Sequence, residues 1–477
     1  MSVMTSTPPS PARSSSGFSL LSKIKSHKES KYLAPPRPNS VHRTGSWGSI
    51  YNQPERSSLF SLPAEEGSGL KSRRLSASPL DDFVVDVCPL ESEFAPLSKF
   101  GRKKEIGKGA SATVKIMLRK GDKKSDNPPY YAVKEFRKKS TRETEEEYVR
   151  KVKSEYTIAK SLDHPNVVRT VRLCTNNGRW NHVMEYCQQG ELFSLVERKY
   201  FKPEDRNCIF KQVLRGVSYL HDHGIAHRDI KLENLLMTDD GHIKITDFGV
   251  SEVFCGDHPG VAISRGLCGQ GMRTPRRSAP GICGSKPYIS PEVLAHDRDY
   301  DPTKLDVWAC GILYMTMCLC GNPWQSTSKN EVNYAVFLEG WKAFLDRFEK
   351  GGDGCPSTTA TPSTIIDENT YPQCGPIFNA LASHSQRRCV LKMLHPDPDK
   401  RCSIHDALND RWIKGIDCCA PDARGANLTN GLDVSKLDSH KVAAKMKVQA
   451  KHDHLPPPVK RLPQHRFDMG DGTSRYD

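Results

Sequence analysis

The order of apolar and polar residues predicts a small sheet and one helix at the start of the ordered chain. Apolar residues alternate with polar ones around glycines over 105–114, and the alternation returns over 131–134, as expected for strands. The polar stretch 121–129 is predicted to be a loop between strands. Over 144–162 the apolar positions recur at helical spacing, with Glu155 on the same stripe. A carboxylate that faces inward requires a partner.

The rest of the pattern predicts a second, mainly helical part. Residues 183–187 form an apolar strand, and the apolar run 307–321, too short to cross a bilayer, is predicted to be a buried helix. The Gly-, Ser- and Thr-rich stretch 351–364 is predicted to be a flexible insertion, and the helical core is expected to end after Trp412. A sheet at the start and helices after it favour an α+β fold.

The two ends of the chain differ in composition from the middle. The extension 1–98 is rich in Ser and Pro and is predicted to be disordered. The tail 415–477, with one expected helix at 442–450, is predicted to be mostly disordered. A formal net charge of +14 favours acidic partners. Because no zinc-finger spacing or RNA-recognition signature accompanies this charge, we expect no nucleic-acid partner.

The cysteines indicate a reducing compartment. The 16 cysteines are scattered, include no C-x-x-C pair, and follow a start that lacks the apolar core of a secretory signal. We therefore expect a cytoplasmic protein with reduced thiols. Cys418 adjoins Cys419, and Cys318 lies close to Cys320, but no His or Cys stands at zinc-like spacing from either pair. Packing is the favoured interpretation of both pairs, and metal binding is the alternative.

One short segment carries the side chains that phosphoryl transfer needs. It reads HRDIKLEN at 227–234, and DFG follows at 247–249. A strand lysine, Lys134, and the inward-facing Glu155 precede it in matching order. This ordered set resembles the catalytic core of eukaryotic protein kinases, from near Phe100 to near Ile413.

The resemblance implies a fold and its boundaries. We expect the bilobed protein-kinase fold, with a small antiparallel sheet and one helix in the N-lobe, a larger and mainly helical C-lobe, and disordered tails. The expected kinase domain is 99–414, divided into an N-lobe at 99–184, a hinge at 185–190 and a C-lobe at 191–414.

The resemblance also implies roles for four catalytic side chains. Asp229 would accept the proton of a substrate hydroxyl, and Lys231 would neutralise charge on the transferring phosphoryl group. Lys134 would contact the α- and β-phosphates while Glu155 fixes its position. Taken alone, Lys134 and Glu155 would be interpreted as a surface lysine and a solvated glutamate. The order of all the motifs along the chain favours the catalytic interpretation instead.

ATP and Mg²⁺ are the implied cofactors. Asn234 and Asp247 would hold the metal ion. The family's third loop glycine is replaced by Ala112, so this loop is a weaker match. By resemblance Met184 lies at the back of the adenine pocket. The residues expected at the nucleotide are Ile106, Gly107, Lys108, Gly109, Ala110, Val114, Ala132, Lys134, Met184, Glu185, Cys187, Glu191, Asn234 and Asp247.

The expected substrates are Ser and Thr hydroxyls of proteins. Lys231, two residues after the catalytic aspartate, resembles serine/threonine kinases. Glu191 and Glu233 match acidic positions that face substrate arginines in basophilic kinases, so substrates near basic residues are expected. A monomer is expected. The alternative is a pseudokinase scaffold that acts through its tails.

A narrower resemblance comes from the end of the activation segment and the residues after it. The chain is similar here to the fungal halotolerance and nitrogen-permease-reactivator kinases, in Gly284-Ser285 before Pro287-Tyr288, in Tyr300-Asp301-Pro302 and Asp306-Val307-Trp308, and in the Ser-rich extension. This implies control of plasma-membrane transporters for potassium or nutrients, and peripheral association with that membrane.

The activation segment departs from the common pattern. Gly281 stands where many kinases carry an activating phosphothreonine, which Arg228 would ordinarily bind. We hypothesise either ordering without a phosphate or the use of Ser278. Downstream, the resemblance implies that Asp306 holds the catalytic-loop backbone and that Arg401 pairs with Glu292.

Overall fold

The computed structural model describes the part of the chain that carries the predicted domain. The described residues are 83–97, 105–108, 112–124, 128–141, 143–349, 366, 370–420 and 454–456. The predictions for 1–82, for the insertion 351–364, for the tail helix 442–450, and for Gly109 and Ala110 lie outside the described residues.

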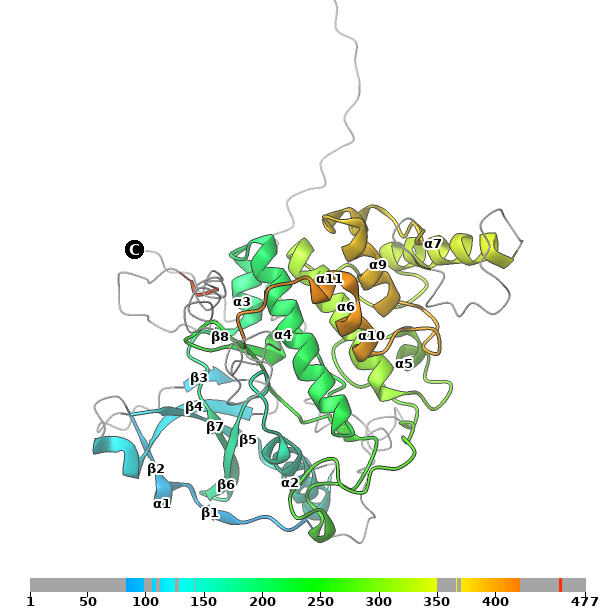
Figure 1. Cartoon of the computed structure of the whole chain (residues 1–477). Coiled ribbons are helices and arrows are strands. Elements are labelled where there is room, and N and C mark those ends of the chain that lie inside the picture. Colours follow the sequence, from blue (N-terminus) through cyan, green and yellow to red (C-terminus); the bar gives the residue numbers. More distant parts are fainter. Residues whose placement is uncertain are drawn as a thin grey trace, which may run out of the picture. The chain divides into compact units, whose positions relative to one another are not determined.

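The N-lobe is built on a seven-stranded sheet (Figure 1). Its strand order is β1-β6-β7-β5-β4-β2, and β3 pairs with β4. The predicted antiparallel pairing is confirmed for all neighbours except the edge strand β1, which is parallel to β6. The strands are β1 (Val87–Pro89), β2 (Phe94–Pro96), β3 (Glu105–Lys108), β4 (Ala112–Arg119), β5 (Tyr130–Phe136), β6 (Thr170–Asn176) and β7 (Arg179–Glu185).

The sheet begins earlier than the sequence predicted. Residues 83–97 fall in the extension that was predicted to be disordered, but they form β1, the short helix α1 (Leu90–Glu93) and β2. Leu90 and Phe94 are buried, and Glu93 lies 2.8 Å from Arg172. The prediction is wrong here because strands of three residues show little periodicity of their own and are stabilised by the sheet edges that they extend.

Helix α2 (Glu145–Ser161) confirms the helix predicted over 144–162. Thr144 caps it, since the Thr144 side chain accepts from the Glu147 N–H and the Glu147 carboxylate accepts from the Thr144 N–H. The negative charges of three glutamates in the first turn also stabilise the helix by interacting with the positive end of its dipole. The inward face buries Val152 against the sheet and carries Glu155 toward the cleft.

The C-lobe is mainly helical, and two of its long helices, α4 (Pro203–Asp222) and α6 (Pro302–Leu319), contact each other. Helix α6 is almost wholly buried, with Trp308 at its centre, which confirms the buried helix predicted from the apolar run. Within the described residues, no helix combines the length and apolar character needed to cross a membrane. The helices are α3 (Leu192–Glu197), α4 (Pro203–Asp222), α5 (Pro291–Ala295), α6 (Pro302–Leu319), α7 (Val332–Glu349), α9 (His384–Met393), α10 (Ile404–Asn409) and α11 (Arg411–Lys414).

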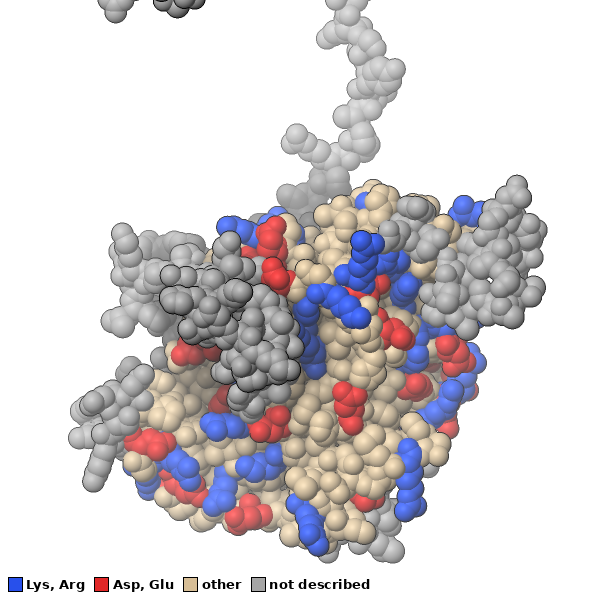
Figure 2. Space-filling view, viewed as in Figure 1, with Lys and Arg blue, Asp and Glu red and all other residues tan. Residues whose placement is uncertain are grey.

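Short strands in the C-lobe support the loops that carry the chemistry. Strand β10 pairs with β11 on one side and β8 on the other, and β9 pairs with β12. The bounds are β8 (Gly190–Glu191), β9 (Ile225–Ala226), β10 (Leu235–Met237), β11 (Ile243–Ile245) and β12 (Glu252–Val253). On the face in Figure 2, basic and acidic side chains are interspersed, so the surplus positive charge does not gather over one element there.

Candidate active site

Three charged side chains from both lobes meet at the cleft. Nζ of Lys134, on β5, lies 2.7 Å from Oε1 of Glu155 on α2 and 2.9 Å from Oδ1 of Asp247. The sequence predicted the Lys134–Glu155 pair, and the structure forms it. Helix α2 is therefore positioned with its carboxylate inside the cleft.

The charges in this group stabilise one another. Burial acts to lower the pKa of Lys134, but the carboxylates of Asp247 and Glu155 outweigh it and hold that pKa above its usual value. Burial acts to raise the pKa of Asp247, and the ammonium groups of Lys134 and Lys231 nevertheless hold it below its usual range. Asp247 therefore remains a carboxylate and Lys134 an ammonium at neutral pH, as binding a cation and a phosphate would require.

The catalytic loop gathers its polar groups around Asp229. Nζ of Lys231 lies 2.9 Å from Oδ2 of Asp229 and donates to Oγ of Ser285 at 2.8 Å. Ser285 in turn donates to Oδ1 of Asp229 at 3.1 Å, and Nδ2 of Asn234 donates to Oδ2 at 3.0 Å. Both carboxylate oxygens are thus oriented. Ser285 was not among the predicted site residues, although its place in the Cys283-Gly284-Ser285 match could have indicated it.

The backbone around this loop is held in uncommon conformations. Arg228 and Asp247 both have φ of 65°, a left-handed value that non-glycine residues seldom adopt. The carboxylate of Asp306 accepts the N–H groups of His227 and Arg228 at 2.8 and 2.7 Å, which confirms its predicted role. A Cβ at Gly284, whose φ is +83°, would lie 2.6 Å from the Arg228 carbonyl oxygen, so only glycine fits beside the loop.

A pocket between the lobes collects most of the residues predicted to contact nucleotide. Ala132 and Met184 form part of its apolar lining. The predicted residues that line it are Ile106, Val114, Ala132, Lys134, Met184, Cys187, Glu191, Asn234 and Asp247. The sequence did not predict the other lining residues as pocket contacts, and most of them belong to no motif. They are Ala112, Glu155, Ala159, Val168, Thr170, His182, Tyr186, Gly190, Glu233, Leu236, Thr246 and Phe248.

Any pocket contacts of Gly107 and Lys108 lie outside what the structure describes, and Glu185 is not among the residues that line this pocket. Gly107 and Lys108 pair with β4 opposite Val114 and Thr113 in the strand ladder. The carboxylate of Glu185 accepts from the N–H of Arg169 at 2.6 Å and lies 2.9 Å from Lys244, so this side chain is engaged elsewhere. The predicted hydrogen bond from the Glu185 backbone stays a prediction.

The activation segment supplies its own partner for Arg228. Nη1 of Arg228 lies 2.6 Å from Oε2 of Glu252, and its Nε donates to the carbonyl oxygen of Val250 at 2.7 Å. Ser278 also donates to Oε2 of Glu252, at 2.7 Å, and is fully buried. Its backbone bridges Tyr300, whose hydroxyl accepts from Arg228 at 3.2 Å. We name Arg228, Glu252, Ser278 and Tyr300 the segment anchor.

A second part of the activation segment packs on the outer face of α2. Nε2 of His258 is 3.0 Å from Oγ of Ser154, and the His258 ring stacks on Phe83 with centroids 4.5 Å apart. The N–H of Val84 donates to the carbonyl oxygen of Gly260 at 2.9 Å. Burial lowers the pKa of His258 to about 3, so the ring is neutral. We name Phe83, Ser154 and His258 the helix clamp.

Two acidic side chains face each other beside the cleft. Burial, together with the nearby carboxylate of Glu233, raises the pKa of Glu191 to about 7. Burial also raises the pKa of Glu233, whose Oε2 has no hydrogen-bond partner within the described residues. A pair of desolvated carboxylates is a natural receptor for a guanidinium group.

A buried ion pair fixes the end of the activation segment. Nη1 and Nη2 of Arg401 lie 2.7 and 2.9 Å from the two carboxylate oxygens of Glu292, as predicted. Ser290, which replaces the more common alanine, donates to Oε1 of Glu292 at 2.8 Å. Removing one partner of such a pair costs about 3 to 5 kcal/mol, because the other charge stays buried.

Comparisons with known proteins agree with this geometry. The protein kinase domain family matches residues 100–413. Serine/threonine-protein kinase HAL4/SAT4 of Saccharomyces cerevisiae is 36% identical over 333 residues, 67% of this chain and 47% of that protein. Serine/threonine-protein kinase hal4 of Schizosaccharomyces pombe is 34% identical over 326 residues, 68% of this chain and 44% of that protein.

A third relative extends the similarity to another named group. The nitrogen permease reactivator protein of Saccharomyces cerevisiae is 34% identical over 329 residues, which cover 66% of this chain and 39% of that protein. The matched region thus spans less than half the length of each of these three relatives. They agree with the fungal group that the sequence motifs indicated.

Proposed function

The chain belongs to the protein kinase family, and from that premise we propose that it transfers the γ-phosphoryl group of ATP to Ser and Thr hydroxyls of proteins. One observation carries the proposal. Lys134, Glu155 and Asp247 form a single ion-paired group, and Asp229 lies beside Asn234 and Lys231 in the same cleft. In this arrangement Asp229 orients a hydroxyl and takes its proton, while Lys231 offsets charge on the transferring group.

The residues present fit a magnesium ion, which we propose as the metal. Nδ2 of Asn234 is used in hydrogen bonds to Asp229, so its amide oxygen is left as a ligand. Together with the Asp247 carboxylate it offers the oxygen donors that Mg²⁺ prefers. When bound, the ion neutralises phosphate charge. The chain's own residues orient the hydroxyl and remove its proton.

We propose that substrates carry arginine before the phosphorylated residue. Burial raises the pKa of both carboxyl groups, Glu191 and Glu233, and Oε2 of Glu233 has no hydrogen-bond partner within the described residues. A substrate guanidinium would offset that cost with charge-assisted hydrogen bonds. A peptide library should therefore be enriched for Arg N-terminal to the phosphorylated residue, and a Glu191→Gln variant should lose that preference.

We propose a role in controlling plasma-membrane transporters, exercised from the cytoplasm by peripheral association. The support is the printed name of one relative, the nitrogen permease reactivator protein. Phosphoproteomics after acute inhibition of a Met184→Gly variant by an enlarged inhibitor would test it. Loss of phosphate from membrane permeases supports the role, and an unchanged permease phosphoproteome contradicts it.

The catalytic proposal itself needs a direct assay. Purified chain with Mg²⁺ and ATP should phosphorylate a basic peptide, and Asp229→Ala should lower the rate by about 10³-fold. The pseudokinase alternative predicts no difference between the two proteins. Retention of Lys134, Asp229, Asn234 and Asp247 disfavours that alternative.

A further inference from the structure

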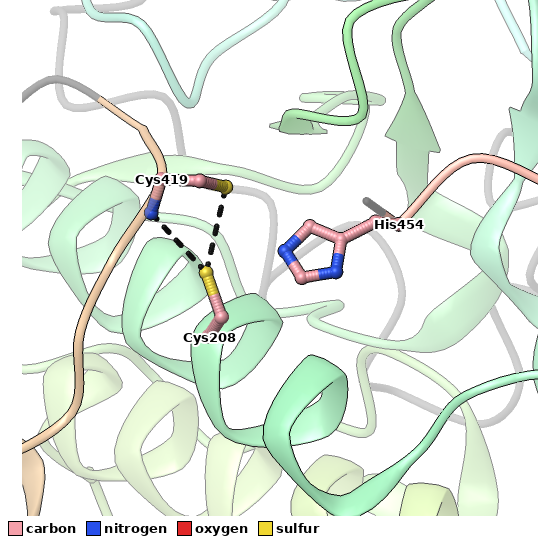
Figure 3. A group of neighbouring side chains, drawn as sticks. All are labelled: Cys208, Cys419 and His454. Atoms are coloured by element: carbon pink, nitrogen blue, oxygen red, sulfur yellow. Dashed lines mark hydrogen bonds between the residues drawn. The ribbon is translucent and has the colours of Figure 1, made fainter. Parts of the chain in front are cut away.

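Two thiols and an imidazole from distant parts of the chain meet on the C-lobe. Cys208 lies on α4, Cys419 follows α11, and His454 belongs to the short described part of the tail. The two sulfur atoms are 3.5 Å apart, and one donor atom from each of the three residues lies within 4.8 Å of the others. Figure 3 shows the two sulfurs and one ring nitrogen directed toward each other. We propose that this cluster is a structural zinc site that fastens the tail to the kinase domain.

The donor set is one that zinc selects. Thiolate sulfur and imidazole nitrogen are its usual ligands in structural sites, which are tetrahedral and closed. Cys208 and His454 are almost completely buried, at 0% and 1% exposure. Cys418, 3% exposed, belongs to the same buried hydrophobic cluster as Cys208. The three residues that lie within reach of one ion offer two sulfurs and one nitrogen.

The histidine is oriented as a metal ligand. Nδ1 of His454 lies 2.9 Å from Oδ1 of Asp205, so this nitrogen donates to the carboxylate. The lone pair is therefore on Nε2, the nitrogen that faces the sulfurs in Figure 3. A carboxylate behind the imidazole is the usual support of a zinc-bound histidine, because it fixes the tautomer and the ring.

The sulfur atoms accept hydrogen bonds from N–H groups, which apolar packing alone would not require. Nε2 of Gln212 lies 3.4 Å from the Cys419 sulfur and 3.6 Å from the Cys208 sulfur. The Cys419 N–H also donates to the Cys208 sulfur, at 3.4 Å. Because Oε1 of Gln212 accepts from the Ile243 N–H at 2.8 Å, its amide nitrogen must face the sulfurs. N–H donors favour the thiolate, which is the form that binds metal.

The arrangement on α4 follows from helix periodicity. Asp205, Cys208 and Gln212 are spaced by three and four residues, so they share one face of α4. That face supplies the carboxylate behind the histidine, one ligand and the N–H donor. The helix thus prepares the site, and Cys419 and His454 complete it.

A zinc ion here would hold the tail near the hinge. The Leu455 carbonyl oxygen accepts from the Tyr200 hydroxyl, and His454 lies over Gly241 in the turn between β10 and β11. In the same turn Asp239 accepts from the hinge residue Gln188 at 3.2 Å. The anchored tail would therefore pack beside the segment that joins the two lobes.

The experiment measures zinc in the full chain purified without chelators, by mass spectrometry of the metal. We expect about one zinc ion per chain, with loss to background in Cys208→Ser/Cys419→Ser and in His454→Gln. The Cys88–Cys174 pair is a matched control, because its sulfurs are also 3.5 Å apart but no histidine of the described residues joins them. Cys88→Ser should retain the zinc.

Two further measurements separate a metal site from simple packing. Asp205→Asn should weaken zinc affinity by about 10- to 100-fold in competition with a chelating dye, since it removes the support of the histidine. A chelator should also increase proteolytic cleavage of the wild-type tail but not of the His454→Gln tail, which is already released. His454 belongs to the tail and to no helix or strand of the kinase domain, so this variant should fold even if the cysteine variant does not.

The proposal fails if wild-type chain and His454→Gln contain the same amount of zinc. It also fails if the chain purified under non-reducing conditions carries no zinc and yields a Cys208–Cys419 disulfide peptide, which would assign the two thiols to redox chemistry. Peptide phosphorylation by His454→Gln, measured in parallel, keeps this result separate from the test of the kinase activity.

Discussion

The catalytic cleft and the segment anchor are both built from buried charges, but the two use them differently. In the cleft, Lys134 is shared between Glu155 and Asp247, and both Lys134 and Asp247 line the pocket, where a phosphate would compete for Lys134 and a cation for Asp247. In the anchor, Arg228 lies 2.6 Å from Glu252; Arg228 is buried, and the Glu252 side chain is 12% exposed. The cleft can exchange partners with a ligand, whereas the anchor keeps partners that belong to the chain.

This difference bears on how the enzyme is switched on. Kinases that need a phosphate on the activation segment leave a basic pocket incomplete until the phosphate arrives. Here the Glu252 carboxylate already pairs with Arg228. Of the two hypotheses from the sequence, ordering without a phosphate is therefore favoured, because a phosphate on Ser278 would lie against the Glu252 carboxylate.

The largest effect is expected from removing a charge in the cleft. Asp247→Asn eliminates the carboxylate that binds Lys134 and would bind the cation, so kcat should fall by about 10³-fold. The melting temperature should change little, because Lys134 retains its pair with Glu155. Steady-state peptide phosphorylation and thermal melting measure both. Activity within a few-fold of wild type would contradict the assigned role of Asp247.

An intermediate effect is expected from breaking the segment anchor. Glu252→Ala leaves Arg228 buried without its carboxylate, so activity should fall by about 10- to 100-fold. Ser278→Ala is the matched variant, since it removes only a hydrogen bond to the same oxygen, and should stay within about two-fold of wild type. Peptide phosphorylation assays measure the activity of both variants, and phosphopeptide mapping shows whether Ser278 is phosphorylated. If Ser278→Ala is inactive and wild type carries a phosphate on Ser278, the hypothesis that phosphorylation of Ser278 orders the segment is supported instead.

A smaller effect is expected from loosening the helix clamp. Phe83→Ala with His258→Ala removes the stacked rings and the contact with Ser154, while Glu155 keeps its pair with Lys134. The rate should drop by about three- to ten-fold as α2 becomes more mobile. Hydrogen exchange of α2 should rise in parallel. Unchanged exchange would mean that the clamp does not position this helix.

The smallest effect is a pH dependence of substrate choice. Because the pKa of Glu191 is raised to about 7, its carboxyl group is largely neutral at pH 6 and ionised at pH 8. The preference for an arginine-containing peptide over its glutamine counterpart, measured as the ratio of kcat/KM values, should therefore rise by a few-fold between these pH values. In Glu191→Gln the ratio should become much flatter. An equally steep profile in that variant would assign the effect to another group.

The sequence located the catalytic groups well because their motifs are local. The residues at 227–234 and 247–249 come together through one loop and one hairpin, so their order along the chain already implies their proximity. The Lys134–Glu155 pair was also predictable, since an inward-facing carboxylate on an amphipathic helix needs a cation. The segment 83–97 was not predictable, because its strands depend on the edges of a sheet that forms elsewhere.

The sequence by itself determined the family, the helix that carries Glu155 and the identities of the reacting groups, because periodicity and motif order are properties of neighbouring residues. Only the tertiary structure decided that Glu252 pairs with Arg228, that His258 packs on α2, and that Cys208, Cys419 and His454 meet. These contacts join residues far apart in the chain whose types alone name no partner. A buried charge or polar group is stable only beside a residue that forms a hydrogen bond or ion pair with it, so the packing of the fold determines which residues become partners.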